Sequence, residues 1–277
     1  MPATATACAR AGLAGNPSDG YGGAVVAVPI PQLKATVTIG EGDPIDLPLL
    51  TAALQVWAEV HGPPGVDRAR WETTIPYSVG LAGSSAIVIA ALRALSALTS
   101  IPVETMPLAT MALRAERDLL GIAAGWQDRV VQAYGTRVLI EGDPPTVREL
   151  PSRFPTFVAW DTAGSAPSGA VHSTLRDRYA RGDPAVLAAM ADLATAARRA
   201  AAATDLDALA AAVDETCAIR ARIGMLTPAT AHLVDLARAA GGHATSAGSG
   251  GSIAGVAEYP DAVVAALHAA GFPALVV

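Results

Sequence analysis

The feature that most constrains this chain is a glycine- and serine-containing loop at residues 76–86, which reads Pro-Tyr-Ser-Val-Gly-Leu-Ala-Gly-Ser-Ser-Ala. It lies between a strand-like segment, Trp71–Ile75, and an apolar segment with helical spacing that runs to Leu98. Glycine removes the Cβ that would block an anion, and the first turn of a helix offers unpaired N–H donors. The loop is therefore a candidate phosphate site. On these residues alone, an ordinary helix start with Ser84 or Ser85 as N-cap residue is the alternative.

Two better-known nucleotide loops are excluded at this position. No Gly-Lys-Ser or Gly-Lys-Thr closes the loop, so it is not the phosphate loop of the P-loop NTPases. The glycine spacing of the dinucleotide-binding fingerprint is also absent.

Composition narrows the class of protein and of partner. Hydrophobic residues make up 52% of the 277 residues and charged residues 16%, enough for a core in one large domain or two small ones. The formal net charge is −6 without a basic block, which argues against nucleic acid or a membrane as partner. Cys8 and Cys217 have no metal-ligand spacing and indicate reduced thiols. No secretory signal is visible and Arg93 interrupts the longest apolar run, so we expect a soluble, cytoplasmic protein.

Strand-like and helix-like segments are mixed without a strict β-α-β alternation, which predicts an α+β fold with antiparallel sheets. Strands are expected at Ala3–Leu13, Ala24–Pro29, Leu33–Ile39, Arg70–Ile75, Arg137–Ile140 and Phe157–Trp160. Further strands are expected on both sides of the glycine loop within His243–Val256, and a short strand at the C-terminus. Helices are expected at Leu49–Val60, Ser84–Leu98, Pro102–Leu120, Asp128–Ala133, Pro184–Ala203, Leu206–Arg222, Pro228–Ala240 and Ala262–Ala270. A composition shift at 142–155 predicts a boundary between an N-terminal domain, residues 1–150, and a C-terminal domain, residues 151–277.

Phosphoryl transfer from ATP requires a phosphate cradle, a magnesium ion, a group that positions or deprotonates the acceptor hydroxyl, and cationic assistance. Magnesium takes oxygen ligands, and Ser85 Oγ with a nearby carboxylate would suit it. Glu116, in the second long helix, and Asp128, after the break at Gly125, are the candidate carboxylates. By local pattern alone, Glu116 would be an exposed helix glutamate and Asp128 a carboxylate at a helix start.

The motifs together resemble those of the GHMP kinases, the small-molecule kinases named for galactose, homoserine, mevalonate and phosphomevalonate. The loop 76–86 resembles the family's phosphate loop, and the glycine-rich stretch 247–252 resembles its third motif. Glu116 and Asp128 match, in order and spacing, the family's magnesium-binding glutamate and the aspartate of its Gly-x-x-Asp motif. Arg10 stands where many members have a lysine that pairs with this aspartate.

The resemblance implies a GHMP kinase fold of two lobes with mixed or antiparallel sheets and helices, with the active site in the cleft between them. It implies Asp128 as the group that orients or deprotonates the acceptor hydroxyl, with Arg10 holding the aspartate ionised. Ser85 and Glu116 would bind Mg²⁺. The ATP phosphates would be bound by Gly80, Leu81, Ala82, Gly83, Ser84, Ser85 and Ala86 of the first loop and by Gly248 and Gly250 of the second.

Within the family, the stretches 15–22, 79–86, 127–130 and 168–176 resemble the glucuronokinases. This implies an ATP-dependent kinase that phosphorylates the anomeric hydroxyl of D-glucuronate. The chain is shorter than the plant members between its first motif and the phosphate loop, the region that tends to hold purine and substrate contacts. The implied substrate-binding residues are Asn16, Asp19, Tyr21, Gly22, Arg129, Ser168, His172, Gly250 and Gly251.

Other functions stay open on the sequence. The same fold can act on a neutral hexose or a heptose phosphate, and a relative can bind sugar or nucleotide without catalysis. A dimeric scaffold whose glycine loops are only turns is a third alternative, and a homodimer is compatible with the kinase as well. The expected ligands are a uronic acid and ATP with Mg²⁺.

Overall fold

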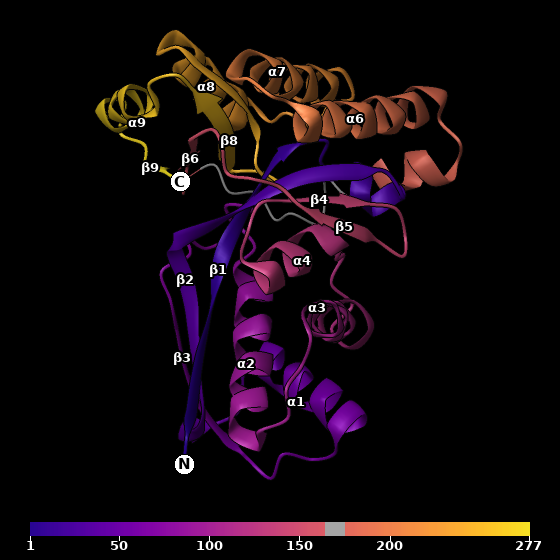
Figure 1. Cartoon of the computed structure of the whole chain (residues 1–277), viewed down its shortest axis with the longest axis vertical. Coiled ribbons are helices and arrows are strands. Elements are labelled where there is room, and N and C mark those ends of the chain that lie inside the picture. Colours follow the sequence, from indigo (N-terminus) through magenta and orange to yellow (C-terminus); the bar gives the residue numbers. More distant parts are fainter. Residues whose placement is uncertain (164–174) are drawn as a thin grey trace. The chain divides into compact units, whose positions relative to one another are not determined.

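The computed structural model describes residues 1–163 and 175–277, and the chain divides into two compact units (Figure 1). Unit 1 consists of Met1–Arg10, Pro29–Ile75 and Ala82–Thr136, and unit 2 of Ala11–Val28, Pro76–Leu81 and Arg137–Val277. Each unit is built from several separate segments of the chain, so this division does not test the predicted boundary near residue 150, which stays a prediction. Two strands, β1 (Ala3–Ala14) and β2 (Ala24–Pro44), contribute residues to both units.

Unit 1 combines strand segments of one sheet, in which β1 and β2 are neighbours, with a group of helices. Residues 35–44 of β2 pair with β3 (Arg68–Thr73), with a bulge between Ile39 and Asp43. Helix α2 (Gly83–Thr99) contacts three further helices of this unit (Figure 1). It buries Ile89, Leu92 and Leu95 completely. The helices are α1 (Pro48–His61), α2 (Gly83–Thr99), α3 (Thr105–Arg114) and α4 (Trp126–Tyr134), and a π-helical segment, η2 (Ala115–Leu119), continues α3.

Unit 2 holds two groups of strands. Residues 24–27 of β2 pair with β4 (Val138–Glu141), which pairs with β5 (Thr146–Glu149). A separate four-stranded antiparallel sheet has the order β7-β8-β6-β9. Its strands are β6 (Thr156–Trp160), β7 (Gly242–Ser246), β8 (Ser252–Ala257) and β9 (Ala274–Val276).

Helices cover this second sheet and bury its core. Helices α7 (Leu206–Arg222), α8 (Pro228–Ala239) and α9 (Pro260–Ala269) contact its strands, and α6 (Pro184–Ala202) packs against α7 (Figure 1). Phe157, Leu233 and Val263 belong to the apolar core between sheet and helices. A short 3-10 helix, η1 (Ser18–Tyr21), contacts α6.

The α+β class with antiparallel sheets is confirmed, and three elements differ from the sequence prediction. The two segments predicted as separate strands form one strand, β2. Its residues 24–27 pair with β4 and its residues 35–44 pair with β3, so the prolines at 29 and 31 lie between these two paired stretches. Neither pairing needs an N–H group from the prolines. The helix predicted over 102–120 starts at Thr105 and changes to π geometry at Ala115. Strand β5 lies inside the stretch that composition marked only as a boundary.

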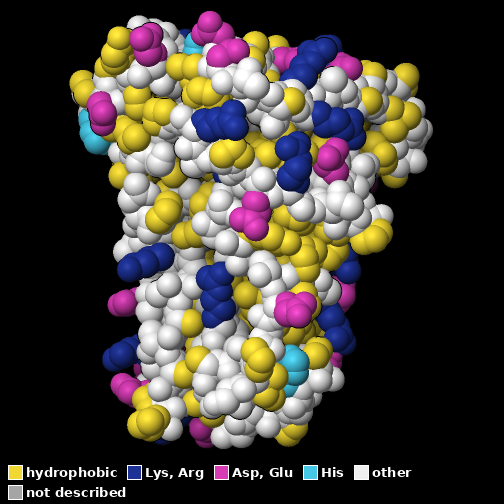
Figure 2. Space-filling model, in the orientation of Figure 1, with side chains coloured by type: hydrophobic (Ala, Val, Ile, Leu, Met, Phe, Trp, Pro, Cys, Tyr) yellow, Lys and Arg dark blue, Asp and Glu magenta, His cyan; other side chains and the backbone are white. Residues whose placement is uncertain are grey.

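The surface of the described residues is mixed in charge. Basic and acidic side chains are interspersed over the face shown in Figure 2. No helix in residues 1–163 and 175–277 combines the length and the hydropathy needed to span a bilayer.

Candidate active site

The start of α2 presents backbone donors that no side chain caps. The helix begins at Gly83, and its N-cap residue is Ala82, which adopts the left-handed conformation with φ +63°. Gln132 of α4 holds this residue, because its Nε2 donates to the Ala82 carbonyl at 2.8 Å. Neither Ser84 nor Ser85 caps the helix, so the first-turn N–H groups and the helix dipole remain suited to an anion.

The serine that contacts the predicted metal carboxylate is Ser84. Its Oγ donates to Glu116 Oε1 at 2.8 Å, whereas Ser85 Oγ donates to the Ala82 carbonyl at 3.2 Å and is buried. Glu116 lies on η2, and π segments inserted in α-helices are frequent at functional sites. Its side chain is 0% exposed, which contradicts the surface glutamate that the local pattern alone suggested.

A buried arginine holds the other oxygen of Glu116. Arg129 Nε donates to Glu116 Oε2 at 2.7 Å, and its Nη2 contacts the same oxygen. Its Nη1 donates to the Gly125 carbonyl at 3.0 Å and lies 3.3 Å from Asp128 Oδ2. The Arg129 side chain is only 3% exposed, so its guanidinium is committed to these internal partners.

Asp128 is paired with arginine on both carboxylate oxygens. It lies in the first turn of α4, where the helix dipole favours a carboxylate. Nε of Arg10 donates to Asp128 Oδ1 at 2.5 Å, the pair that the family resemblance implies. Its side chain is 20% exposed, whereas those of Arg10 and Arg129 are 8% and 3% exposed. Asp128 is therefore the carboxylate of this group that a solute can approach.

In unit 2, the loop before Ala82 lies backbone to backbone against the second glycine loop. A Cβ on Gly80, whose φ is +81°, would lie 2.8 Å from the Gly250 carbonyl oxygen and 3.1 Å from Ser249 N. A Cβ on Gly251, at φ +72°, would lie 3.1 Å from Val79 Cα. Two glycine segments far apart in the sequence thus approach as closely as only glycine permits.

A buried arginine fixes the second glycine loop to the turn at residues 15–18. Arg220 of α7 is 1% exposed, and its Nη1 and Nη2 donate to the carbonyls of Asn16 and Gly248 at 2.9 and 3.0 Å. Asn16 is itself buried, with Nδ2 donating to the Ser246 carbonyl at 3.0 Å. Its Oδ1 has no hydrogen-bond partner among the described residues, which is unusual for a buried acceptor.

Two further residues predicted to bind substrate lie on η1. Asp19 is buried, and the Tyr21 ring packs against the Tyr179 ring with centroids 4.4 Å apart. Partial burial raises the pKa of the Tyr21 hydroxyl, an effect that the nearby Arg176 charge opposes. Gly22 ends η1 at φ +73°, a conformation that favours glycine.

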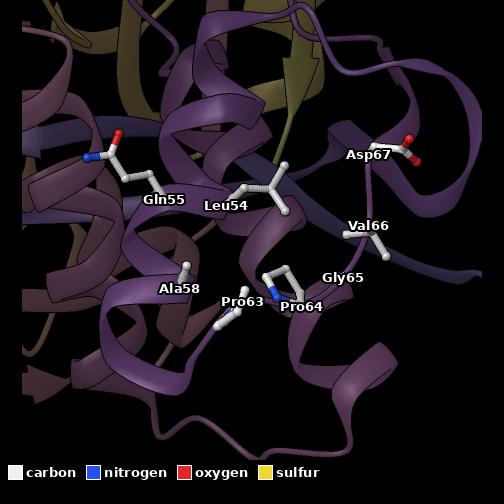
Figure 3. Close-up of a pocket in the computed structure, with 8 residues that line it drawn as sticks. All are labelled: Leu54, Gln55, Ala58, Pro63, Pro64, Gly65, Val66 and Asp67. Atoms are coloured by element: carbon white, nitrogen blue, oxygen red, sulfur yellow. The ribbon is translucent and has the colours of Figure 1, made fainter.

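Two predicted substrate-binding residues cannot be placed, and one surface depression lies away from the predicted site. Ser168 and His172 lie outside the described residues. A surface depression of about 610 Å³ lies between α1 and the loop 63–67 that leads to β3, and its lining includes none of the predicted site residues (Figure 3).

The sequence prediction missed Arg220 and the partner of Arg129. Arg220 follows Val213, Thr216 and Cys217 at helical spacing, so its place on the buried face of α7 was a usable signal. The Arg129–Glu116 pair joins residues 13 apart across a glycine break, and no local pattern predicts it.

Two family models match this chain. The GHMP kinases N terminal domain matches residues 48–136, and the GHMP kinases C terminal domain matches residues 197–273. The chain belongs to the GHMP kinase family.

Among curated proteins, two from Arabidopsis thaliana are similar to it. Probable glucuronokinase 2 is 32% identical over 204 residues, and glucuronokinase 1 is 32% identical over 202 residues. Each match covers 66% of this chain and 55% of the relative, so the chain spans about half the length of these relatives.

Solved structures share the fold at low identity. The mevalonate kinase of Methanococcus jannaschii has a TM-score of 0.79 at 15% identity, covering 100% of this chain and 97% of its own. The Streptococcus pneumoniae phosphomevalonate kinase in complex with phosphomevalonate and AMPPNP has a TM-score of 0.75 at 15% identity, with 99% of both chains covered.

Proposed function

We propose that this chain is an ATP-dependent sugar kinase that phosphorylates the anomeric hydroxyl of D-glucuronate. Family membership and the similarity to two plant glucuronokinases support the reaction class and the sugar. The observation that carries the proposal is the group in unit 1: a solvent-accessible Asp128 paired with Arg10, and Glu116 bonded to Ser84 at the start of α2. A neighbour crystallised with AMPPNP supports an adenine nucleotide as donor.

Asp128 orients the acceptor hydroxyl in this proposal. Both of its carboxylate oxygens contact guanidinium groups, which favour the ionised form and weaken it as a base. Phosphoryl transfer has a loose transition state that depends mainly on positioning and charge stabilisation. An ionised carboxylate that accepts a hydrogen bond from the sugar hydroxyl provides that positioning.

The hydroxyl of Ser84 at the start of α2 and the carboxylate of Glu116 on η2 are oxygen groups of the kind that would hold a magnesium ion. Mg²⁺ takes oxygen ligands and is usually bound through one or two protein groups together with substrate phosphates and water. Ser84 Oγ and Glu116 Oε1 are 2.8 Å apart. We therefore assign Ser84 and Glu116 as the protein ligands, with Ser84 in place of the predicted Ser85. When bound, the ion neutralises charge on the transferring phosphoryl group.

The phosphates are assigned to the two glycine loops. In unit 1, residues 82–86 supply the N-terminal donors of α2. In unit 2, Gly80 of the first loop lies against Gly250 of the second. Gly248 is held by Arg220. For the sugar, Asn16 offers a buried acceptor, Oδ1, whose unmet hydrogen bond a hydroxyl would satisfy. Asp19, Tyr21, Gly22 and Gly251 keep their predicted substrate roles as part of this proposal.

One observation favours a neutral sugar as a second candidate. Arg129 was predicted to meet the substrate carboxylate, and its guanidinium is instead buried against Glu116 and Asp128. A uronic acid would then need another cation. Coupled detection of ADP over a panel of uronic acids, neutral hexoses and heptose phosphates separates the two candidates, and preference for a neutral sugar would reject glucuronate.

The role of Asp128 is tested by Asp128→Asn. The amide keeps the size of the side chain and removes the charge that orients the hydroxyl, so kcat should fall by about 10²–10⁴-fold while nucleotide affinity changes little. Asp118→Asn is the matched control, because Asp118 is exposed and pairs only locally with Arg117 in the described contacts. Turnover of the Asp128 variant within a few-fold of the parent would contradict the assignment.

A further inference from the structure

Arg129 is a permanent cation placed between the two carboxylates of the candidate site. It contacts Oε2 of Glu116 and lies 3.3 Å from Oδ2 of Asp128, and Arg10 binds the other oxygen of Asp128. The four side chains joined by these pairs carry two positive and two negative charges, so their formal charge is zero. A guanidinium does not lose its proton in a protein, so the two positive charges of this group persist at every working pH.

Because these side chains are buried, their charge balance strongly affects whether a metal ion can bind. The Glu116 and Arg129 side chains are 0% and 3% exposed, so solvent does not screen their charges. A magnesium ion gives up hydration water reluctantly, and it needs net negative charge at the site to compensate for that loss. Oε1 of Glu116 remains available as a ligand atom beside Ser84. The negative charge of Glu116, which would attract a free Mg²⁺ ion, is already neutralised by Arg129 at Oε2.

We propose that Arg129 is a built-in counter-cation that keeps free Mg²⁺ from binding to Glu116, so that the ion enters the site only together with the negatively charged nucleotide. The inference rests on the proposed assignment of Ser84 and Glu116 as metal ligands. It gives Arg129 a positioning and charge-balancing role in place of substrate recognition.

The inference predicts a gain of metal binding on removal of the arginine. Arg129→Gln leaves the four-residue group with a charge of −1 next to an intact Glu116. In the absence of nucleotide, millimolar MgCl₂ should then raise the thermal midpoint of this variant by at least about 3 °C relative to EDTA, in buffers of matched ionic strength. The parent protein should show no such shift with MgCl₂ alone, and a clear shift with MgCl₂ and AMPPNP together.

Three variants keep the result interpretable. Arg129→Lys retains the charge and should show no shift with free Mg²⁺, and Arg114→Gln controls for loss of an exposed arginine of the same unit. If Arg129→Gln fails to fold, Arg10→Gln lowers the charge of the group by the same amount and should itself show the shift. A Mg²⁺ shift in the parent without nucleotide, or no shift in either glutamine variant that folds, would overturn the inference.

The proposed function and the proposed role of Arg129 can be rejected independently of each other. The metal experiment uses no sugar and no turnover, so a parent that phosphorylates no uronic acid leaves its outcome unaffected. Conversely, a parent that turns over glucuronate and also binds free Mg²⁺ would reject the role of Arg129 and keep the reaction.

Discussion

Two residues at the glycine loops, Gly80 and Arg220, show why the backbone here requires particular residue types. Gly80 has a left-handed φ of +81°, and the space a Cβ would fill is already occupied by the Gly250 carbonyl. Arg220 spans the other side of the second loop, where its buried guanidinium satisfies two carbonyl groups that would otherwise lose their hydrogen bonds on burial. Gly80 belongs to the proposed phosphate loop, whereas Arg220 shapes the second loop without being a ligand in the proposed site.

Gly80→Ala should therefore cost more stability than an alanine at another left-handed glycine. Strain at positive φ alone costs about 1 kcal/mol, and the contact with Gly250 adds a steric cost, so we expect a total loss of roughly 2–4 kcal/mol. Gly224→Ala is the matched control, because its φ is +76° and nothing lies within 4 Å of its added Cβ. Urea unfolding measures both, and equal losses would show that the two loops do not approach closely.

At the scale of elements, the way a helix begins or changes geometry decides what its side chains reach. The π segment η2 interrupts the regular i→i−4 pattern at Ala115, and Glu116 turns into the interior rather than to solvent. Helix α2 starts without a side-chain cap, whereas α6 has Asp183 as its N-cap residue, whose carboxylate accepts from Ala185 N and Val186 N. A missing side-chain cap is shared by α1, α3, α4 and α9, so it permits the proposed phosphate role of α2 without singling that helix out.

Asp183 provides a pH test of the N-terminal cap of α6. Its hydrogen bond with Arg178, together with the helix N–H groups, holds the pKa of its carboxyl below the usual value. The stabilisation is thus complete above the unfolded pKa of about 3.9 and is lost as the pH falls through the lower folded value. Asp183→Ala should lower the thermal midpoint at pH 7, with a difference that shrinks below pH 4.

Asparagine at the same position separates the cap from the charge. Asn caps a helix about as well as Asp, so Asp183→Asn should fall between the parent and the alanine variant at pH 7. A gap between parent and alanine variant that stays constant down to pH 3 would contradict the role of the ionised carboxylate.

At the scale of the whole molecule, the chain contributes several separate segments to each compact unit. It passes from one unit to the other between Arg10 and Ala11 and again between Leu81 and Ala82. The loop at 76–86 is therefore shared, with its first six residues in unit 2 and its remainder in unit 1. Neither unit is a contiguous stretch that a simple truncation could isolate.

Cys217 reports on the integrity of unit 2. It is 2% exposed in the core beside Phe157 and Leu233, and burial raises the pKa of its thiol, so little thiolate is present at pH 8. In a Cys8→Ser variant, the remaining thiol should react with a disulfide reagent at least about 100-fold more slowly in native buffer than in urea. Rapid stoichiometric labelling of the native protein would show that this core opens freely.

The local pattern of residues was sufficient for much of the fold, whereas the proposed site residues came from the family resemblance. Periodicity placed most helices and strands, because amphipathic spacing and glycine or proline breaks act over a few residues. The two glycine loops, Glu116, Asp128 and Arg10 were all found from motifs and their order, and the Arg10–Asp128 pair is present. The continuous β2 was missed, because whether a proline interrupts a strand depends on which neighbour needs its N–H.

What required the folded chain was the pairing of side chains that are distant or ambiguous in sequence. Ser84 and Ser85 are indistinguishable by motif, and the direction of α2 gives the contact with Glu116 to Ser84 alone. Arg129 was predicted to bind a substrate carboxylate, whereas in the structure it pairs with the buried Glu116. A buried carboxylate needs a cation beside it, and only the folded chain determines which carboxylates are buried. Sequence motifs therefore specify which groups the chain carries, and three-dimensional packing specifies which of them meet, because desolvation and distance have no meaning along a linear chain.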